Sequence, residues 1–492
     1  MSTLKAQAVK SIKWTSLQTI IVGLTGPVVL ILKSQFLEPA DFAYLSIILI
    51  VIGLFKLLEN FGISQAIIQK DAITVKESSS IFWFNILFSA LLAVIIYRAS
   101  SLIAEFYAMP GLEHYLKVAS VIVLINGPSV LFRAYLEKAI FFKQLAVISI
   151  SRNMINLAAI FLLLFQGYGV LGVVYAHIIS TLAATLMIIT ISLRHTRIRL
   201  GFHFKASDLY PFLRFGAFVS GKQLLTFATH RVDELLIGYL LSPEILGIYH
   251  FGKQMLEKIR GIMTRSFSKV LFPVFSKLKN NTKRLSGAYR QISKFLAHGA
   301  FPVFTGIAVT AHLFVPVVFG EKWEDSIIVF QIFSLSMIFL LLTANVSSAL
   351  LYSVNKPGLV FYIDLITNSI YLFSLLLFAS RGLIAILLVY TAYIIYKTMI
   401  LQYFTNKQLT QTFTSYLQGI LLPAVLSSVM IISILLFQHL TSAYLSDTVL
   451  LVCSILLGGT VFTALSWFFA RDIMHELIRI IKGNTIKFQA KH

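Results

Sequence analysis

Long apolar stretches separated by short polar segments recur along the whole chain of 492 residues. A helix that crosses a bilayer needs about 20 consecutive, predominantly apolar residues, and most of these stretches are close to that length. The pattern therefore predicts an all-α integral membrane protein with about fourteen transmembrane helices. The predicted spans lie near residues 12–32, 41–61, 79–97, 116–134, 145–165, 169–192, 212–235, 244–272, 295–319, 326–350, 358–379, 382–403, 415–438 and 446–470.

A short turn that follows the first span returns at the corresponding place in the second half of the chain. The stretch FLEPADFAYL contains Pro39, and its counterpart LLSPEILGIY contains Pro243. A second correspondence aligns GVLG, near residue 169, with GLIA, near residue 382, where the last span of each six-span set begins. The first six spans are therefore predicted to be a copy of the next six. Since six is an even number, both copies enter the membrane from the same side, as parallel repeats do.

The repeat predicts two pseudo-symmetric six-helix lobes with two further helices appended at the C-terminal end. Two similar lobes around a central cavity are a common architecture for transport by alternating access. We predict an N-terminal lobe at 1–192, a cytoplasmic amphipathic linker at 193–211, a C-terminal lobe at 212–405, and two additional spans with a basic cytoplasmic tail at 406–492.

The charged residues are few and unevenly placed. Hydrophobic residues make up 58% of the chain and charged residues only 12%, whereas about 25% of the residues in soluble domains are charged. The net charge of +21 comes from Lys and Arg in alternate loops, and the intervening loops carry only Lys33, Arg98, Lys322 and Arg381. This asymmetry predicts that both termini face the cytoplasm. Topology and attraction to anionic membrane lipids account for the positive charge, so no nucleic-acid partner is expected.

The chain offers little for catalysis or for a cofactor. Cys453 is the single cysteine and lies in the last predicted span, which excludes an internal disulfide framework and a cysteine metal cluster. The connections on the outside, such as QGYG and LSPE, are short. Because no loop is long enough to form a catalytic domain, we expect a protein that is not an enzyme and that needs no cofactor.

Several stretches carry a family resemblance. They are RVDELLIGYLLSPEILGIYHFGKQ (231–254), LFPVFSKLKNN (271–281) and VFGEKWEDSIIVFQIFSL (318–335), the last with Gly320, Lys322 and Trp323 in a G-x-K-W pattern. With these motifs in this order, the chain resembles the polysaccharide-transporter branch of the multidrug/oligosaccharidyl-lipid/polysaccharide exporter superfamily. It looks most like the O-antigen, capsule and colanic-acid flippases, and the resemblance covers nearly the whole chain.

The resemblance implies a flippase of the bacterial cytoplasmic (inner) membrane. Such a protein moves undecaprenyl-diphosphate-linked oligosaccharide repeat units from the cytoplasmic to the periplasmic leaflet. The family fold, two six-helix lobes around a central cavity, agrees with the predicted spans, and transport in the family is thought to be coupled to an ion. The implied partners are the undecaprenyl-diphosphate-linked glycan, the membrane lipids and other proteins of polysaccharide assembly.

Basic residues inside the predicted spans cluster on the second, seventh and eighth spans. A charge at membrane depth costs about 2.5–3.5 kcal/mol on insertion scales, so it is rarely present without a function. An anionic diphosphate requires such groups. We predict that Lys56 and Arg260, which the repeat aligns, face each other across the cavity and contact the diphosphate. The other predicted cavity cations are Lys222, Lys253 and Arg231.

Acidic residues at membrane depth are candidates for ion coupling, and they are Asp233, Glu257 and Glu59. The neighbouring Glu234 is expected to point elsewhere, near the outside. The alternative interpretation is structural, with internal ion pairs Lys253–Glu257, Lys56–Glu59 and Arg231–Asp233. His177 is expected to be a core or interface residue.

Other functions fit the pattern less well. A multidrug/cation antiporter of the same superfamily needs an acidic cavity, whereas the deep charges here are predominantly basic. A lipid II flippase faces the same diphosphate headgroup and remains an alternative. A membrane polymerase or ligase acting on the same lipid generally needs a sizeable outward-facing catalytic loop, which the short connections do not provide.

Overall fold

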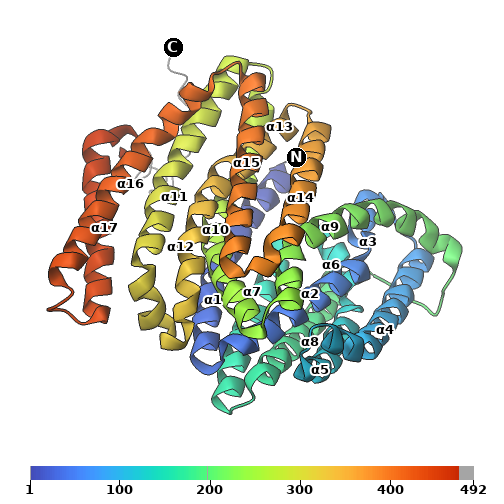
Figure 1. Ribbon diagram of the computed structural model, residues 1–492. Coiled ribbons are helices and arrows are strands. Elements are labelled where there is room, and N and C mark those ends of the chain that lie inside the picture. The colour runs from blue at the N-terminus through green and yellow to red at the C-terminus, as the bar shows by residue number, and fades with distance from the viewer. Residues whose placement is uncertain (1, 197, 476–492) are drawn as a thin grey trace. The chain divides into compact units, whose positions relative to one another are not determined.

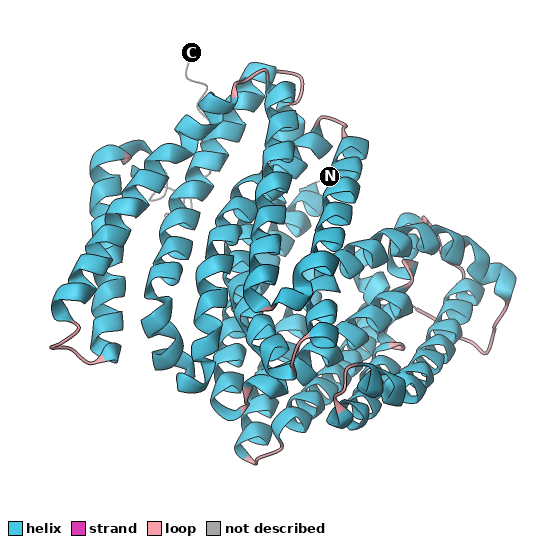
Figure 2. Cartoon of the chain, in the orientation of Figure 1, coloured by secondary structure: helices cyan, strands magenta, loops and turns pink. Residues whose placement is uncertain are grey.

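The computed structural model describes residues 2–196 and 198–475, except for the helical side chains of residues 2–13, 16, 218, 222 and 265–270. The described residues form helices joined by loops, and no strand occurs among them (Figure 2). This result confirms the predicted all-α fold class.

Packing divides the chain into two compact units, Met1–His250 and Phe251–His492. The boundary lies inside one long helix, α10 (Pro243–Leu278), whose first eight residues belong to the first unit. The lobe boundaries at residues 192 and 212 stay a prediction. We describe each unit by itself.

The first unit is a bundle in which α7 packs on α1 and α8, while α5 packs on α4 and α8. α2 lies against α5 and α9 and also contacts α8. Its helices are α1 (Ser2–Phe36), α2 (Pro39–Asn60), α3 (Ile63–Gln69), α4 (Val75–Phe106), α5 (Pro110–Asn126), α6 (Ser129–Lys138), α7 (Phe142–Phe165), α8 (Gly169–His195) and α9 (Ala206–Leu240), which Figure 1 shows in chain order from blue to green.

The second unit is built around α11, which packs on α12, α16 and α17. A single π-helical turn, η2, joins α12 to α13. Its helices after α10 are α11 (Thr282–Phe319), the 3-10 turn η1 (Glu321–Ser326), α12 (Ile327–Phe339), η2 (Leu340–Ala344), α13 (Asn345–Ser353), α14 (Pro357–Phe378), the 3-10 turn η3 (Ala379–Arg381), α15 (Leu383–Leu409), α16 (Phe413–Thr441) and α17 (Asp447–Phe469) (Figure 1).

Both copies of the repeated turn begin a helix at their proline. Pro39 is the first residue of α2, and Pro243 is the first residue of α10. Proline suits this position because its fixed φ matches the helix and its missing N–H is not needed there. At α2, the Asp41 carboxylate also accepts a hydrogen bond of 3.0 Å from the Glu38 backbone N–H. The turn signals in the sequence therefore mark true helix starts.

Each predicted span coincides with a helix or with a pair of consecutive helices. Among the described residues, eleven helices are long and apolar enough to cross a membrane, or twelve if the bent pair α5 and α6 counts as one span. α9 and α10 occupy the positions of the seventh and eighth predicted spans and are not among these helices. Their basic and acidic residues lower their hydropathy, so the count of about fourteen stays a prediction.

The fourth predicted span is not straight. α5 ends at Asn126 and α6 begins at Ser129, with a bend of 45° between them. Pro128 has no N–H to continue the helical hydrogen bonds. Gly127 lies so close to α4 that a Cβ atom on it would be 2.2 Å from the Ser89 hydroxyl oxygen. The bend is therefore specified by a Gly-Pro pair at a tight helix crossing.

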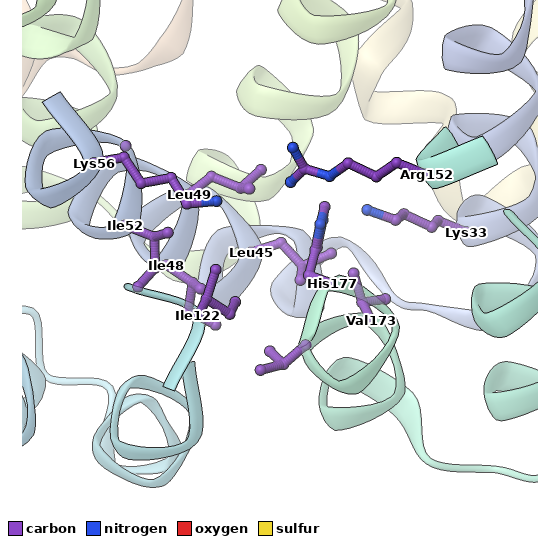
Figure 3. Close-up of a pocket in the computed structure, with 12 residues that line it drawn as sticks. Lys33, Leu45, Ile48, Leu49, Ile52, Lys56, Ile122, Arg152, Val173 and His177 are labelled. Atoms are coloured by element: carbon purple, nitrogen blue, oxygen red, sulfur yellow. The ribbon is translucent and has the colours of Figure 1, made fainter. Parts of the chain in front are cut away.

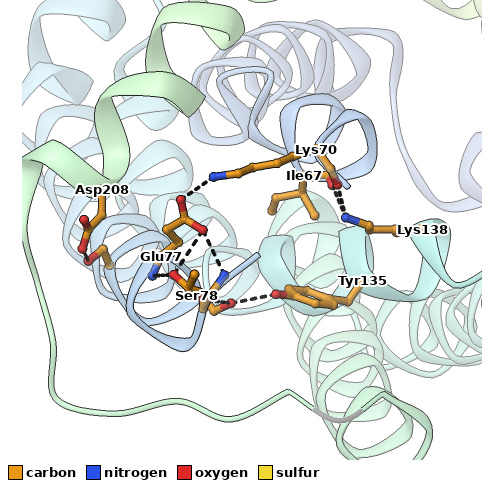
Figure 4. A network of polar contacts seen from close by, with 9 residues as sticks. Ile67, Lys70, Glu77, Ser78, Tyr135, Lys138 and Asp208 are labelled. Carbon is orange, nitrogen blue, oxygen red and sulfur yellow. Dashed lines mark hydrogen bonds and ion pairs between the residues drawn. The ribbon is translucent and has the colours of Figure 1, made fainter. Parts of the chain in front are cut away.

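A polar network fastens the ends of α3, α4 and α6 (Figure 4). Lys70, which follows α3, forms an ion pair with Glu77 in the first turn of α4. Lys138 at the end of α6 donates to the carbonyl oxygens of Lys70 and Ile67, the second over 3.1 Å. Charged residues in this part of the first unit therefore hold helix ends together.

In the second unit, aromatic and polar groups share the interior. Trp323 of η1 is 0% exposed, and its ring centroid lies 4.1 Å from that of Phe251. Tyr289 of α11 donates to the Gln402 side-chain oxygen of α15 over 2.6 Å. Gln402 and Gln411 each donate to the Asn406 side-chain oxygen, over 2.7 and 2.9 Å. This neutral network links α11, α15 and the turn before α16.

Candidate functional site

Helices α1, α2, α5, α7 and α8 of the first unit enclose a cavity of about 160 Å³. One face of α2 forms much of its wall. On that face, aliphatic residues and one basic residue recur at helical spacing, and they are Leu45, Ile48, Leu49, Ile52 and Lys56. Residues three or four positions apart lie on the same side of a helix, so the sequence of α2 places Lys56 at the end of an apolar stripe.

Basic groups from different helices converge on this cavity. Lys33 of α1, Lys56 of α2 and Arg152 of α7 all line it. Figure 3 shows Lys56 reaching in from one side, while Arg152 and Lys33 reach in from the other. His177 of α8 points into the same space between them (Figure 3). No acidic residue is among those that line the cavity in the described part of the chain.

The surroundings of these cations favour an anion. Lys33 is only 6% exposed, and Arg152 donates from Nη2 to the Thr181 hydroxyl over 3.3 Å. Lys56 has no carboxylate oxygen within 4.0 Å among the described residues. Aliphatic walls keep the local dielectric constant low, which strengthens attraction between these groups and a negative charge. The cavity can therefore bind a phosphate or carboxylate group.

Glu59 lies one turn beyond Lys56 and is fully buried, with 0% exposure. Its Oε2 accepts a hydrogen bond of 2.8 Å from the Asn126 amide of α5. Its Oε1 is also buried and has no hydrogen-bond partner. The alternative interpretation of a Lys56–Glu59 ion pair does not describe this arrangement, because Asn126 holds the carboxylate instead.

Arg231 forms an ion pair with Glu234. The Arg231 guanidinium lies 2.8 Å from Glu234 Oε1. Glu234 Oε2 accepts from the Ser46 hydroxyl of α2 and contacts the His250 Nδ1 of α10, each over 2.7 Å. Glu234 is 1% exposed and contacts Arg231, so the expectation that it points elsewhere on the helix is wrong, while its place near the outside of the membrane stays a prediction. On a helix, residues three apart share a face, which brings Arg231 to Glu234.

Asp233 is also buried, at 2% exposure. Its carboxylate accepts a hydrogen bond from the hydroxyl of Tyr249. This contact ties α9 to the first turns of α10. The structure thus places Asp233 beside the cluster of Arg231 and Glu234, and its role in ion coupling stays a prediction.

The remaining predicted site residues lie on α9 and α10. Lys253, at 3% exposure, and the half-buried Glu257 and Arg260 belong to the second unit. The Arg260 Nε atom is buried without a hydrogen-bond partner among the described residues. Lys56 belongs to the first unit, so the predicted pairing of Lys56 with Arg260 across a cavity stays a prediction. The side chain of Lys222 lies outside the described residues.

Sequence reasoning selected Lys56 but missed the residues that join it. Lys33 was assigned to an outside loop, yet α1 continues to Phe36 and carries Lys33 into the cavity wall. Arg152 is a basic residue in the middle of an otherwise apolar span, a signal that could have found it. His177 lines the cavity from α8, where core packing was expected. Their convergence depends on helix packing, which helical periodicity alone does not specify.

Comparison with known proteins identifies relatives in polysaccharide biosynthesis. The profile of the family described as polysaccharide biosynthesis protein matches residues 34–328. The teichuronic acid biosynthesis protein TuaB of Bacillus subtilis is 25% identical over 437 residues, which cover 87% of this chain and 89% of TuaB. The lipopolysaccharide biosynthesis protein WzxC of Escherichia coli is 25% identical over 334 residues, or 67% of each chain.

Solved structures share the fold. The lipid II flippase MurJ in an inward closed conformation has a TM-score of 0.74 at 15% identity, covering 94% of this chain and 100% of its own. An inward-facing multidrug resistance transporter of the MATE family has a TM-score of 0.60 at 15% identity, covering 81% of this chain and 98% of its own. At these identities the likeness concerns the fold alone.

The family match extends over more than half of the chain and includes the motifs at 231–254 and 271–281. The curated relatives and the helical fold agree with it. The predicted resemblance is confirmed at the level of the family: this chain belongs to the polysaccharide biosynthesis protein family.

Proposed function

We propose that this chain is a flippase for undecaprenyl-diphosphate-linked oligosaccharide repeat units. It moves them from the cytoplasmic to the periplasmic leaflet of the bacterial cytoplasmic membrane by alternating access, with coupling to an ion. Relatives in teichuronic acid and lipopolysaccharide biosynthesis support a polysaccharide precursor as cargo. The observation that carries the diphosphate assignment is the cavity lined by Lys33, Lys56 and Arg152, with no acidic residue in its described lining.

The chemistry of the cargo explains the need for this cavity. A diphosphate headgroup with its sugars cannot cross hydrocarbon unaided, because removing its charges from water is prohibitive. The prenyl chain is apolar and can stay in the lipid throughout. Arginine suits such a headgroup because its planar guanidinium can donate two parallel hydrogen bonds to a phosphate. We assign this role to Arg152, with Lys56 and Lys33 as point charges.

The charge of the cavity separates this function from one of its two alternatives. A multidrug/cation antiporter would have to bind a positive ligand among these basic groups, which like-charge repulsion opposes. A lipid II flippase carries the same diphosphate linkage, so the cavity fits both kinds of cargo. The polysaccharide family match favours the repeat unit, and the cargo can be identified by what accumulates when the protein is removed.

The proposal predicts a change in the sidedness of lipid-linked sugars. Inner-membrane vesicles lacking the protein should hold undecaprenyl-linked repeat units in the cytoplasmic leaflet, and restoring the protein should move them across. The double variant Lys56→Ala/Arg152→Ala should reduce flipping about tenfold or more, since each charge-assisted hydrogen bond contributes about 1.5–3 kcal/mol. Sidedness is measured by the access of an impermeant sugar-modifying reagent.

A matched control is Lys117→Ala. Lys117 is a basic residue of α5 that pairs with Glu113 and does not line the cavity. It should transport normally at equal abundance in the membrane. Normal flipping by the double variant would show that the cavity is not the diphosphate site. Unchanged sidedness in vesicles that lack the protein would show that the repeat unit is not its cargo. Accumulation of lipid II instead of repeat units would establish the lipid II alternative.

A further inference from the structure

Glu59 is a carboxylate in the interior of the first unit, and no counter-charge among the described residues lies at contact distance from it. It is 0% exposed, and Asn126 gives it one hydrogen bond of 2.8 Å. Oε1 is buried and has no partner. An amide supplies a dipole but no positive charge. A carboxylate in this position therefore needs either a proton or a nearby cation, because an ionised, unpaired group is costly to keep away from water.

The charged groups around Glu59 are limited. On its own helix, Lys56 is the basic residue that acts on it, with Arg152 of α7 beyond Lys56. From α5 it meets the neutral Asn126. α4, α8 and α9 also pack on α2. His177 of α8 lies at the cavity, and the side chain of Lys222 on α9 lies outside the described residues.

Lys56 and Glu59 are three residues apart on α2, so their side chains are neighbours on the helix surface. In this structure the Lys56 side chain extends into the cavity, on the side facing Arg152 (Figure 3). Because the lysine side chain is long and flexible, a change of rotamer can bring its ammonium group toward the Glu59 carboxylate. The same ammonium group can therefore serve the cavity or the carboxylate, but not both.

We propose that Glu59 is a proton-binding switch that sets the affinity of the cavity for anions, which rests on the function proposed above. When a proton binds at Oε1, the carboxyl group is neutral and Lys56 stays in the cavity for the substrate diphosphate. When the proton leaves to water, Lys56 turns to the carboxylate and the cavity loses one positive charge. Anion and proton therefore bind together, and each raises the affinity for the other by the same factor.

The test measures binding of a short-chain prenyl-diphosphate-linked sugar to the full-length protein in nanodiscs between about pH 5.5 and 8.5. Each phosphate of this probe has one ester bond, one anhydride bond and one strongly acidic hydroxyl, so the charge of the probe is constant over this range. Affinity of the unaltered protein should fall as pH rises, by about tenfold, which is a typical size for coupling between two sites. Calorimetry in buffers of different ionisation enthalpy should show proton uptake on binding, of about half a proton per probe at most, because tenfold coupling limits the change in proton occupancy.

Glu59→Gln should bind tightly at all these pH values and take up no proton, because its neutral amide mimics the protonated acid and keeps its contact with Asn126. Lys56→Gln should bind weakly, with no pH dependence from this source. The control Glu113→Gln, on the exposed side of α5, should keep the original profile. The structural role of a buried carboxylate alone would not produce this loss of proton uptake.

The outcomes separate the switch from the function on which it rests. If Glu59→Gln keeps the original pH profile and proton uptake, Glu59 is not the proton-binding group, and the assignment of the cavity as the diphosphate site is unaffected. If Lys56→Gln/Arg152→Gln binds the probe as tightly as the unaltered protein, the cavity is not the diphosphate site and the proposed function loses its main support. A flat profile in Glu59→Gln together with weak binding in the double variant supports both.

Discussion

Glu234 joins three helices through one carboxylate. It accepts from Arg231 on its own helix over 2.8 Å, and it contacts Ser46 of α2 and His250 of α10, each over 2.7 Å. The neighbouring Asp233, which the sequence singled out as the titratable group of α9, contacts Tyr249. Since consecutive residues on a helix point in different directions, each acid meets a different partner.

Glu234→Gln should destabilise the first unit by about 3 kcal/mol, because it removes a buried negative charge that contacts Arg231 and His250. The amide of glutamine can still contact Ser46. The expected result is a lower unfolding temperature of the purified protein in detergent, measured by the fluorescence of its tryptophans.

Glu244→Gln is the matched control for this experiment. Glu244 is an exposed acidic residue in the first turn of α10, and exposed substitutions usually change stability by less than about 0.5 kcal/mol. Equal unfolding temperatures for the two variants would show that the Glu234 contacts contribute little to the fold.

The two copies of the repeated turn touch each other at the level of the elements. A Cβ atom on Gly247 of α10 would lie 1.7 Å from the carbonyl oxygen of Pro39 and 3.3 Å from the backbone nitrogen of Ala43. The repeat aligns Gly247 with Ala43, so the close approach uses the smaller residue of the pair. Small residues at such crossings let helix backbones approach within a membrane.

Gly247→Ala should therefore force α2 and α10 apart and destabilise the protein by more than about 2 kcal/mol, as overpacking against a backbone does. The measurement is the yield of folded, monodisperse protein together with its unfolding temperature. A variant as stable as the unaltered protein would contradict the close contact.

Gly287→Ala on α11 provides the opposite case. A Cβ atom at Gly287 meets nothing within 4 Å, and alanine favours a helix over glycine by about 1 kcal/mol. This variant should be as stable as the unaltered protein or more so. Comparison of Gly247→Ala with Gly287→Ala therefore separates the effect of the contact between α10 and α2 from the effect of helix propensity.

The helices themselves were predictable from the sequence because apolar length and the proline turns mark where they start and end. The π-helical turn η2 was not, since it occurs inside a continuous apolar run. The bend between α5 and α6 was not predicted either, although Gly127 and Pro128 mark its place in the sequence. The family motif that contains Trp323 is visible in the sequence, but the burial of Trp323 of η1 against Phe251 of α10 was not predictable from it.

The candidate site was less predictable than the fold. Lys56 is recognisable as a charge inside an apolar span, and so is Arg152. Whether two such charges share a cavity depends on how α2 and α7 pack around α8, and that contact leaves no local pattern. Lys33 shows the same limit, because near the end of a helix a basic residue has the same appearance whether it faces water or a cavity.

At the scale of the whole molecule, the number of membrane crossings depends on α9 and α10. Both are long enough to span a bilayer, with 35 and 36 residues, but their charges keep them outside the set chosen by hydropathy. If both cross, the turn at Ser242 lies outside and the end of α10 lies in the cytoplasm, as the distribution of Lys and Arg predicts.

Single cysteines can test this topology in a Cys453→Ser background, which removes the native thiol. Ser242→Cys should react with an impermeant maleimide in spheroplasts, whereas Lys279→Cys should react only after the membrane is opened. Lys279 is exposed just beyond the end of α10. Equal labelling of both positions would mean that α10 does not cross the membrane.

The neutral network of the second unit has a mechanical consequence for the two C-terminal helices. Ser286 donates to Gln411 over 3.0 Å, and Gln411 is bonded in turn to Asn406 of α15. The short connection between α15 and α16 is thus hydrogen-bonded to α11, and α16 and α17 also pack on α11. Because α16 and α17 are fixed to α11 in this way, a spin label on α17 should report the movement of α11 and the helices packed on it.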